Sequence, residues 1–186
     1  MKILFVDTET GGITKRSALI QLSGIVQLGK TTAEEFNFFV KPYAGSEVTD
    51  EALRIQGRTR EEVETFEPEE VVFKKFMEIL DRYIDKYNKE DKFIIAGYNV
   101  RFDIDVIGRF LNRHGEKYLF SYIQSTTLDP LQWVAPLQLL KKIPVLKDNK
   151  LETWCNYFEI ELKAHDSLED IRATKALTKK MMKLMM

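Results

Sequence analysis

Two carboxylates near the N-terminus, Asp7 and Glu9, are separated by a single residue in the segment KILFVDTETGG. The apolar residues that precede them are typical of a buried strand, and side chains two positions apart in a strand lie on the same face. We therefore expect both carboxylates to point into one pocket. Gly11 and Gly12 follow directly, and a turn without side chains would let the backbone of a ligand come close.

Two further motifs place acids at the starts of predicted helices. Asn99 and Asp103 lie four residues apart where an apolar strand gives way to a helix, and this spacing predicts one shared helical face. His165 and Asp170 flank the start of the last predicted helix. Five residues along an ideal helix rotate by about 140°, so both reach one site only if His165 precedes the helix and Asp170 lies within it. Each of these spacings arises easily by chance. The prediction of one shared site therefore depends on the placement of all the acids at strand ends and helix starts.

Four clustered carboxylates need compensating charge. Two unit charges 4 Å apart repel by roughly 4 kcal/mol at an effective dielectric constant near 20, and two divalent cations would remove that cost. Ligands that are all oxygens indicate Mg²⁺ or Mn²⁺ rather than zinc. Two such ions, roughly 3.5–4 Å apart, clamp a scissile phosphate, one activating the attacking water and the other stabilising the leaving oxygen. A neutral histidine nearby takes the proton of the water, and His165 is placed for that role.

The hydrophobic pattern indicates which elements position these residues. Residues 2–8, 18–28 and 34–41 are predicted strands, and the links between them are too short for a crossover helix, so they should pair antiparallel. Further strands are expected at 93–99 and 125–129, and helices at about 49–55, 69–87, 100–113, 130–140, 150–158 and 167–184. This order predicts an α/β fold in which helices flank a mixed five-stranded sheet, three antiparallel strands followed by two parallel ones. In such sheets, sites form at the carboxyl ends of strands.

Size and composition limit the class of protein. The 186 residues, 44% apolar and 31% charged, suit a single globular domain spanning 1–186. No apolar run is long enough for a membrane span, no signal peptide is expected, and a single cysteine, Cys155, makes a reducing cytoplasm the expected location. The formal net charge of −1 lacks the basic excess of proteins that coat duplex DNA. A nucleic acid would therefore be held as a single strand in a cleft.

At the acidic motifs the sequence strongly resembles the DEDDh exonucleases, a family that includes the proofreading subunit of the bacterial replicative DNA polymerase. The segment VDTETGG (6–12) resembles the first exonuclease motif, GYNVRFDI (97–104) the second, and AHDSLEDI (164–171) the third. The resemblance implies a ribonuclease-H-like fold, two divalent metal ions, and release of nucleoside 5′-monophosphates from a 3′ end. It further implies that Asp7, Glu9, Asp103 and Asp170 are metal ligands and that His165 is the general base.

The same resemblance implies substrate contacts around the first two motifs. They fall on Thr8, Thr10, Gly11, Gly12, Ile13, Asn99 and Phe102. Ile13 lies where related enzymes place an apolar residue against the 3′-terminal base, and Asn99 is expected to support the site. The family often has threonine at the position of Gly11 and histidine at that of Gln56, and these departures bear on how the terminal nucleotide is held. Asp166 occupies the place where a related subgroup has tyrosine, so the histidine type is favoured.

The sequence leaves several alternatives open. Ser167 and Asp170 also fit an S-x-x-D capping box, Asn99 also fits a helix cap, and Phe102 fits a core aromatic as well as a residue that stacks on a base. Single-stranded DNA is the favoured substrate and RNA the alternative, because discrimination depends on 2′-hydroxyl contacts. An inactive nucleic-acid-binding module is a third interpretation. A polymerase or repair complex is a candidate partner, and a membrane is not.

Overall fold

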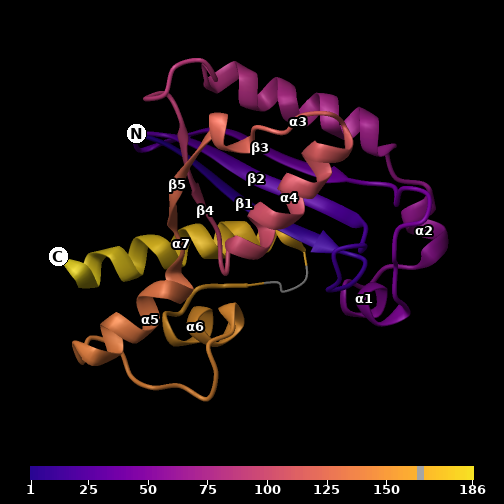
Figure 1. Ribbon diagram of the computed structural model, residues 1–186. Coiled ribbons are helices and arrows are strands. Elements are labelled where there is room, and N and C mark those ends of the chain that lie inside the picture. Colours follow the sequence, from indigo (N-terminus) through magenta and orange to yellow (C-terminus); the bar gives the residue numbers. More distant parts are fainter. Residues whose placement is uncertain (163–165) are drawn as a thin grey trace.

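The computed structural model describes residues 1–162 and 166–186. Within these residues, five strands form one sheet in the order β3-β2-β1-β4-β5 (Figure 1). They are β1 (Lys2–Thr10), β2 (Leu19–Leu28), β3 (Thr31–Phe39), β4 (Phe93–Ala96) and β5 (Ile123–Leu128). β1 pairs antiparallel with β2, and β2 with β3, whereas β4 runs parallel to both β1 and β5. The predicted mixed sheet is therefore confirmed.

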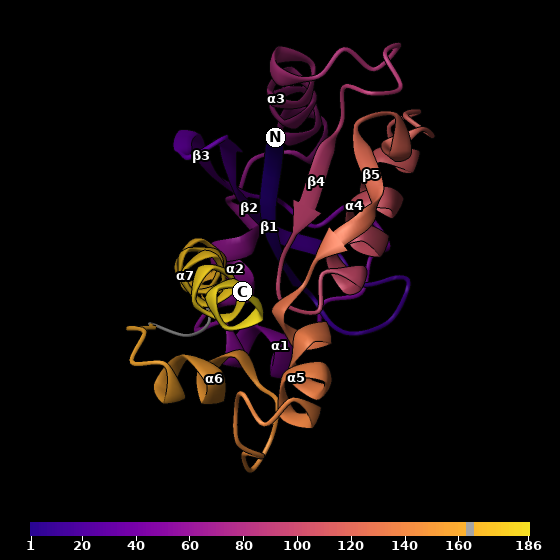
Figure 2. The same ribbon diagram turned by 90° about the vertical axis from the view of Figure 1, so that its left-hand side faces the viewer.

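Helices cover both faces of the sheet. They are α1 (Asp50–Ile55), α2 (Arg60–Glu64), α3 (Glu69–Tyr83), α4 (Arg101–Arg113), α5 (Pro130–Leu139), α6 (Leu151–Tyr157) and α7 (Ser167–Met185), with one 3-10 turn, η1 (Leu119–Ser121). Figure 1 shows α3 and α4 on one side of the sheet and α7 on the other, and Figure 2 shows α5 and α6 beside α7. The sequence did not predict α2 or η1. In the described part of the chain, no helix combines the length and apolarity needed to cross a membrane.

β1 lies at the centre of the sheet, and its side chains alternate between two cores. Leu4 and Val6 pack in the core under α3 and α4, whereas Ile3 and Phe5 pack in the core under α7. A strand that is buried on both faces has a continuous apolar sequence, and this is why KILFV precedes Asp7. The acidic side chains appear only near the carboxyl end of the strand, where the sheet gives way to helix starts and loops.

β4 is shorter than the predicted strand 93–99, because the chain turns after Ala96. A Cβ at Gly97 would lie 2.8 Å from the carbonyl oxygen of Val6, and Asn99 has a left-handed backbone with φ 59°. Asn99 thus precedes α4, and the predicted helical face shared with Asp103 is wrong. The helix-cap interpretation of Asn99 is also wrong, because the N-cap of α4 is Val100 and has no side-chain cap hydrogen bond.

Candidate metal centre

Three of the four predicted acids meet in space. One carboxylate oxygen from each of Asp7, Glu9 and Asp170 lies within 4.8 Å of the others, and all three residues are half-buried. Asp7 and Glu9 project from the same face of β1, as their spacing predicts, and Asp170 lies in the first turn of α7. The start of α7 is fixed against the sheet, since the hydroxyl of buried Ser167 donates to that of Ser23, the β2 partner of Asp7.

Asp103 is held next to this group by β1 itself. It lies in the first turn of α4 and is only 3% exposed. Its Oδ1 accepts two hydrogen bonds from Thr8, at 2.9 Å from the backbone nitrogen and 2.7 Å from Oγ1. Thr8 separates Asp7 from Glu9 in the strand, so the bonds bring the start of α4 to the acidic end of β1. The hydroxyl of Thr8, a predicted substrate contact, thus orients this acid.

The electrostatics show that burial and mutual repulsion raise the pKa values of the acids in this cluster. Burial, followed by the charges of Asp103, Glu9 and Asp170, raises the pKa of Asp7 well above its ordinary value. Burial and the charge of Asp170 raise the pKa of Glu9 to about 7, although Arg58 opposes that shift.

Burial also raises the pKa of Asp103 to about 7, against the lowering effect of the Thr8 hydrogen bonds. Carboxylates in such a cluster need either protons or cations. Because the donors are all oxygens, they fit hard divalent cations such as Mg²⁺ or Mn²⁺.

Replacing Thr8 with valine is expected to weaken metal binding by about tenfold or more, the usual effect of removing a hydrogen bond that orients a ligand. Without the hydroxyl bond the pKa of Asp103 rises further, so protons compete better with the metal. Titrating activity with Mn²⁺ would measure the change as an increase in the half-saturating metal concentration. Thr178→Val is the matched control, since its buried hydroxyl bonds to Thr174 O within α7. Equal metal dependence in the wild type and Thr8→Val would contradict this role.

Asp129 is a residue of the site that the sequence analysis missed. It is 2% exposed, and its Oδ1 accepts hydrogen bonds from the backbone nitrogens of Asn99 and Leu131, both at 3.0 Å, while its Oδ2 accepts one from Val100 at 3.2 Å. One carboxylate therefore caps α5 and also holds the left-handed turn that leads into α4 and Asp103. The available signal was an aspartate directly before Pro130, which is typical of a helix N-cap.

Replacing Asp129 with alanine is expected to lower the free energy of unfolding by roughly 2–4 kcal/mol. Three backbone N–H groups lose their acceptor, the bond from Val100 being buried and those from Asn99 and Leu131 part-buried. Activity should fall as well, since the turn that positions Asp103 is no longer fastened. Thermal unfolding and kcat are the measurements. Asp129→Asn keeps one oxygen acceptor and should lie between alanine and the wild type. A fully stable Asp129→Ala protein would show that the turn holds without the carboxylate.

The start of α7 differs from the capping-box interpretation. The N-cap is Asp166, whose Oδ1 accepts from the backbone nitrogens of Leu168 and Glu169. Ser167 is inside the helix, and its hydroxyl contacts Ser23. Asp170 is therefore not part of an S-x-x-D cap, and its place within the helix agrees with the prediction. The general-base prediction concerns His165, which lies outside the described residues.

The residues predicted to contact substrate fall into two groups. Ile13 is 94% exposed and Phe102 is 37% exposed, so the core interpretation of Phe102 is wrong and both can meet a ligand. Thr10 Oγ1 instead donates to the carbonyl of Gly12. Gly11 has a packing role within the chain, because a Cβ there would lie 2.5 Å from the carbonyl oxygen of Glu47. Segment 47–48 therefore approaches Gly11 closely.

Comparisons with known proteins agree with this geometry. The chain matches the model of the RNase T family, described as exonuclease, over residues 4–178. A structure of E. coli exonuclease I in complex with a dT13 oligonucleotide is 23% identical with a TM-score of 0.76, covering 96% of this chain and 40% of that chain. The zinc-ion-bound form of an E. coli exonuclease I complex with single-stranded DNA is 25% identical with a TM-score of 0.80, covering 96% and 39%.

The match to these solved structures is therefore a match to part of a longer protein, since this chain spans about 40% of their length. Comparison with curated protein sequences gave no match. Together with the strand order, the structural likenesses confirm the predicted ribonuclease-H-like fold class.

Proposed function

This chain belongs to the RNase T exonuclease family, and on that premise we propose that it hydrolyses single-stranded DNA from the 3′ end and releases nucleoside 5′-monophosphates. The observation that carries the proposal is the convergence of Asp7, Glu9 and Asp170 at the carboxyl end of β1. Oligonucleotides bound to the similar E. coli enzyme support a single-stranded DNA substrate here. We further propose that residues 1–186 form one exonuclease domain.

In this proposal Asp7, Glu9 and Asp170, together with Asp103, hold two divalent cations, Mg²⁺ or Mn²⁺. Such ions, when bound, lower the pKa of water and neutralise charge on the phosphate. The part played by the chain is to keep these acids in place before metal arrives. Thr8 fixes Asp103, and the strand geometry of β1 fixes Asp7 and Glu9 side by side.

His165 is proposed to act as the general base. An imidazole nitrogen takes a proton from the attacking water, whose oxygen forms a bond to phosphorus. The bond from phosphorus to the 3′ oxygen of the preceding nucleotide breaks, which leaves the 5′-phosphate on the released nucleotide. The assignment rests on the resemblance of segment 164–171 to the third exonuclease motif. It also rests on the position of Asp170 inside α7, which the spacing of His165 and Asp170 requires if both are to reach one site.

The exposed apolar residues Ile13 and Phe102 are proposed to contact the terminal bases. Each is at the surface close in sequence to a metal ligand, Ile13 four residues after Glu9 and Phe102 directly before Asp103. Base stacking on apolar and aromatic side chains is tolerant of sequence. The formal net charge of the chain is −1, so it lacks the basic excess that broad phosphate contacts need. Stacking of the terminal bases and contacts through the metal ions would hold the 3′ end without that excess.

The test is digestion of 5′-labelled single strands and duplexes of DNA and of matched RNA, in Mg²⁺, in Mn²⁺ and in EDTA. The proposal predicts a ladder of shortened strands that keep the 5′ label, only with metal and fastest on single-stranded DNA. Faster digestion of RNA than of DNA would identify the chain as an exoribonuclease. Binding of the strand without cleavage in either metal would identify the chain as an inactive nucleic-acid-binding module.

We propose that the chain acts in proofreading or repair, as part of a polymerase or repair complex. Duplexes with a mismatched 3′ terminus present a frayed single-stranded end, so a proofreading enzyme should digest them faster than matched duplexes. Equal rates on both would argue against that role while leaving the exonuclease activity in place.

A further inference from the structure

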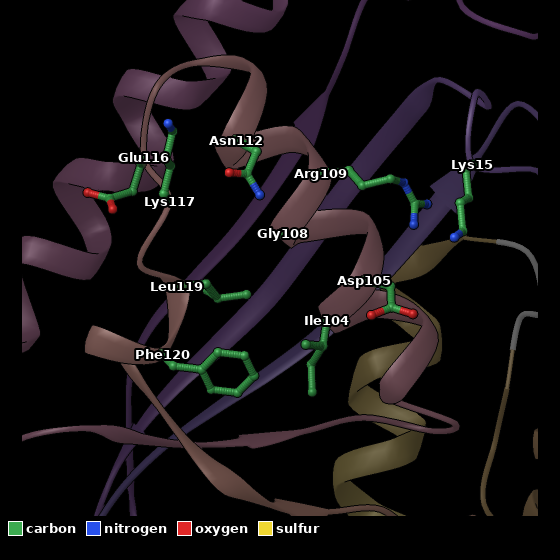
Figure 3. Close-up of a pocket in the computed structure, with 10 residues that line it drawn as sticks. All are labelled: Lys15, Ile104, Asp105, Gly108, Arg109, Asn112, Glu116, Lys117, Leu119 and Phe120. Atoms are coloured by element: carbon green, nitrogen blue, oxygen red, sulfur yellow. The ribbon is translucent and has the colours of Figure 1, made fainter.

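A groove with a volume of about 420 Å³ runs along the outer face of α4, and none of its lining residues belongs to the acidic cluster (Figure 3). Apolar side chains form its floor: Ile104 from α4, and Leu119 and Phe120 from η1. Phe120 is 55% exposed, and Figure 3 shows its ring facing the space between η1 and α4. An exposed aromatic ring that faces a groove is a platform on which a nucleic-acid base can stack.

Gly108 keeps this groove open. It lies in the middle of α4, where glycine is less favourable than alanine. A Cβ at this position would meet a single atom within 4 Å, Leu119 Cδ2 at 4.0 Å, which is an ordinary contact. Packing inside the chain therefore does not require glycine here. A longer side chain, by contrast, would project into the groove and reduce the space for a ligand.

Three cations border the apolar floor: Lys15, Arg109 and Lys117. None of them forms an ion pair with any residue that the structure describes. Of the two acids in the lining, Glu116 lies 3.5 Å from Lys86 and also accepts from the Tyr118 nitrogen, so that only Asp105 opposes the cations directly. Figure 3 shows Arg109 and Lys15 extending from α4 and from the loop after β1 toward the same end of the groove. An excess of cations over acids beside an apolar floor suits a phosphate attached to a base.

Two elements that line the groove, α4 and the loop after β1, also lead to the candidate metal centre. On α4, Arg109 follows Asp103 by six residues, which is about 9 Å along the helix axis. On the loop after β1, Lys15 follows the exposed Ile13 by two residues. A strand whose 3′ end reaches the acids therefore has a bordering path along α4 for its next nucleotides.

We propose that this groove binds a nucleotide of a single strand a few positions upstream of its 3′ end. One base stacks on Phe120, and the adjoining phosphates lie near Arg109 and Lys15. The inference rests on the proposed exonuclease function and extends it, because it assigns a binding site for the part of the strand that is not cleaved. Such a site would raise affinity for long strands. It would not act on a dinucleotide, because Phe120 precedes the amino end of β5 whereas the acids lie near the carboxyl end of β1, which runs in the same direction.

The test compares KM and kcat for the 15-mer dT15 and for a dinucleotide, using Phe120→Ala, Arg109→Ala and Gly108→Leu. Each variant is expected to raise KM for dT15 by about tenfold, the scale of one lost base stack, with kcat little changed. The ratio of the KM values for dT15 and the dinucleotide should rise accordingly. Phe120→Tyr keeps the ring and should restore the low KM, and Gly108→Ala should behave as glycine does, because its Cβ fits. Lys179→Ala removes an exposed cation from α7, on the opposite face of the sheet, and serves as the control for charge.

Binding is measured separately by the anisotropy of 5′-fluorescein-labelled dT15 in EDTA, where hydrolysis does not run. Weaker binding by the groove variants than by Lys179→Ala would support the groove even if the wild type proved unable to cleave, so the two proposals can fail independently. An active wild type whose groove variants keep the KM for dT15 would overturn the groove. An equal rise of KM for both substrates would overturn it too, because the effect would then not depend on strand length.

Discussion

Replacing Asp7 with asparagine is expected to abolish metal-dependent release of mononucleotides. Asp7 belongs to the group of three acids whose oxygens lie within 4.8 Å of one another, and burial followed by the charges of Asp103, Glu9 and Asp170 raises its pKa. Removing one member of a unit that acts together costs roughly 10³-fold or more in kcat. Initial rates on a 5′-labelled single strand at saturating Mg²⁺ would measure the loss.

The same substitution is expected to stabilise the metal-free protein. The folded-state pKa values of Asp7, Glu9 and Asp103 are all raised, those of Glu9 and Asp103 to about 7. A carboxyl with a raised folded pKa contributes its full stability below the unfolded pKa, near 4, and that contribution is lost as the pH rises through the folded pKa. In EDTA the wild type should therefore lose stability between about pH 4 and pH 8, relative to Asp7→Asn.

Above pH 7 the variant should be more stable than the wild type by on the order of 1–3 kcal/mol, since asparagine cannot carry the repelling charge. Melting temperatures in EDTA across this pH range would measure the difference. Excess Mn²⁺ should reverse the order, because a bound ion stabilises the folded state by mass action and the wild type binds it better. Glu78→Gln, which removes an exposed charge from α3, is the control and should follow the wild type. Normal activity in Asp7→Asn, or an unchanged metal-free melting curve, would contradict the metal assignment.

The parts of this site that follow from local geometry were predictable from the sequence. Asp7 and Glu9 share a face because the side-chain period of a strand is two, and that holds wherever β1 packs. Asp170 could be placed inside the last helix because five residues turn too far for one helical face. The antiparallel pairing of the first three strands followed from the lengths of their links, since short links force antiparallel neighbours.

The parts that depend on distant contacts were not predictable. Nothing near Thr8 indicates that its hydroxyl holds an acid 95 residues away. Gly11 reads as a position for ligand approach, yet the atom that excludes a side chain there is the Glu47 carbonyl oxygen. At the start of α7, the S-x-x-D pattern at 167–170 indicated Ser167 as a possible cap, and Asp166 was not considered as one. Burial of Ser167 against Ser23 decides between them in favour of Asp166.

Replacing His165 with alanine is expected to lower kcat by about 10²- to 10⁴-fold at pH 7.5, the range for loss of a general base. It should also remove the limb of the pH profile on which the rate rises as an imidazole loses its proton, ordinarily near pH 6.5. His114 is the other histidine of the chain, and its Nε2 lies 3.2 Å from a carboxylate oxygen of Glu69. His114→Gln is therefore the control, and it should keep the limb.

The difficulty is that two carboxyls of the metal site titrate in the same range. Glu9 and Asp103 have pKa values of about 7 without metal, so their deprotonation would also make the rate rise with pH. The two causes respond differently to metal concentration. Metal competes with protons for the carboxylates, so raising Mg²⁺ moves their limb to lower pH, whereas an imidazole that holds no metal keeps its own pKa. A limb that stays near pH 6.5 at saturating Mg²⁺ and vanishes in His165→Ala would identify the base. A limb that moves steadily with Mg²⁺ and persists in that variant would assign the pH dependence to the metal ligands and remove His165 from the mechanism.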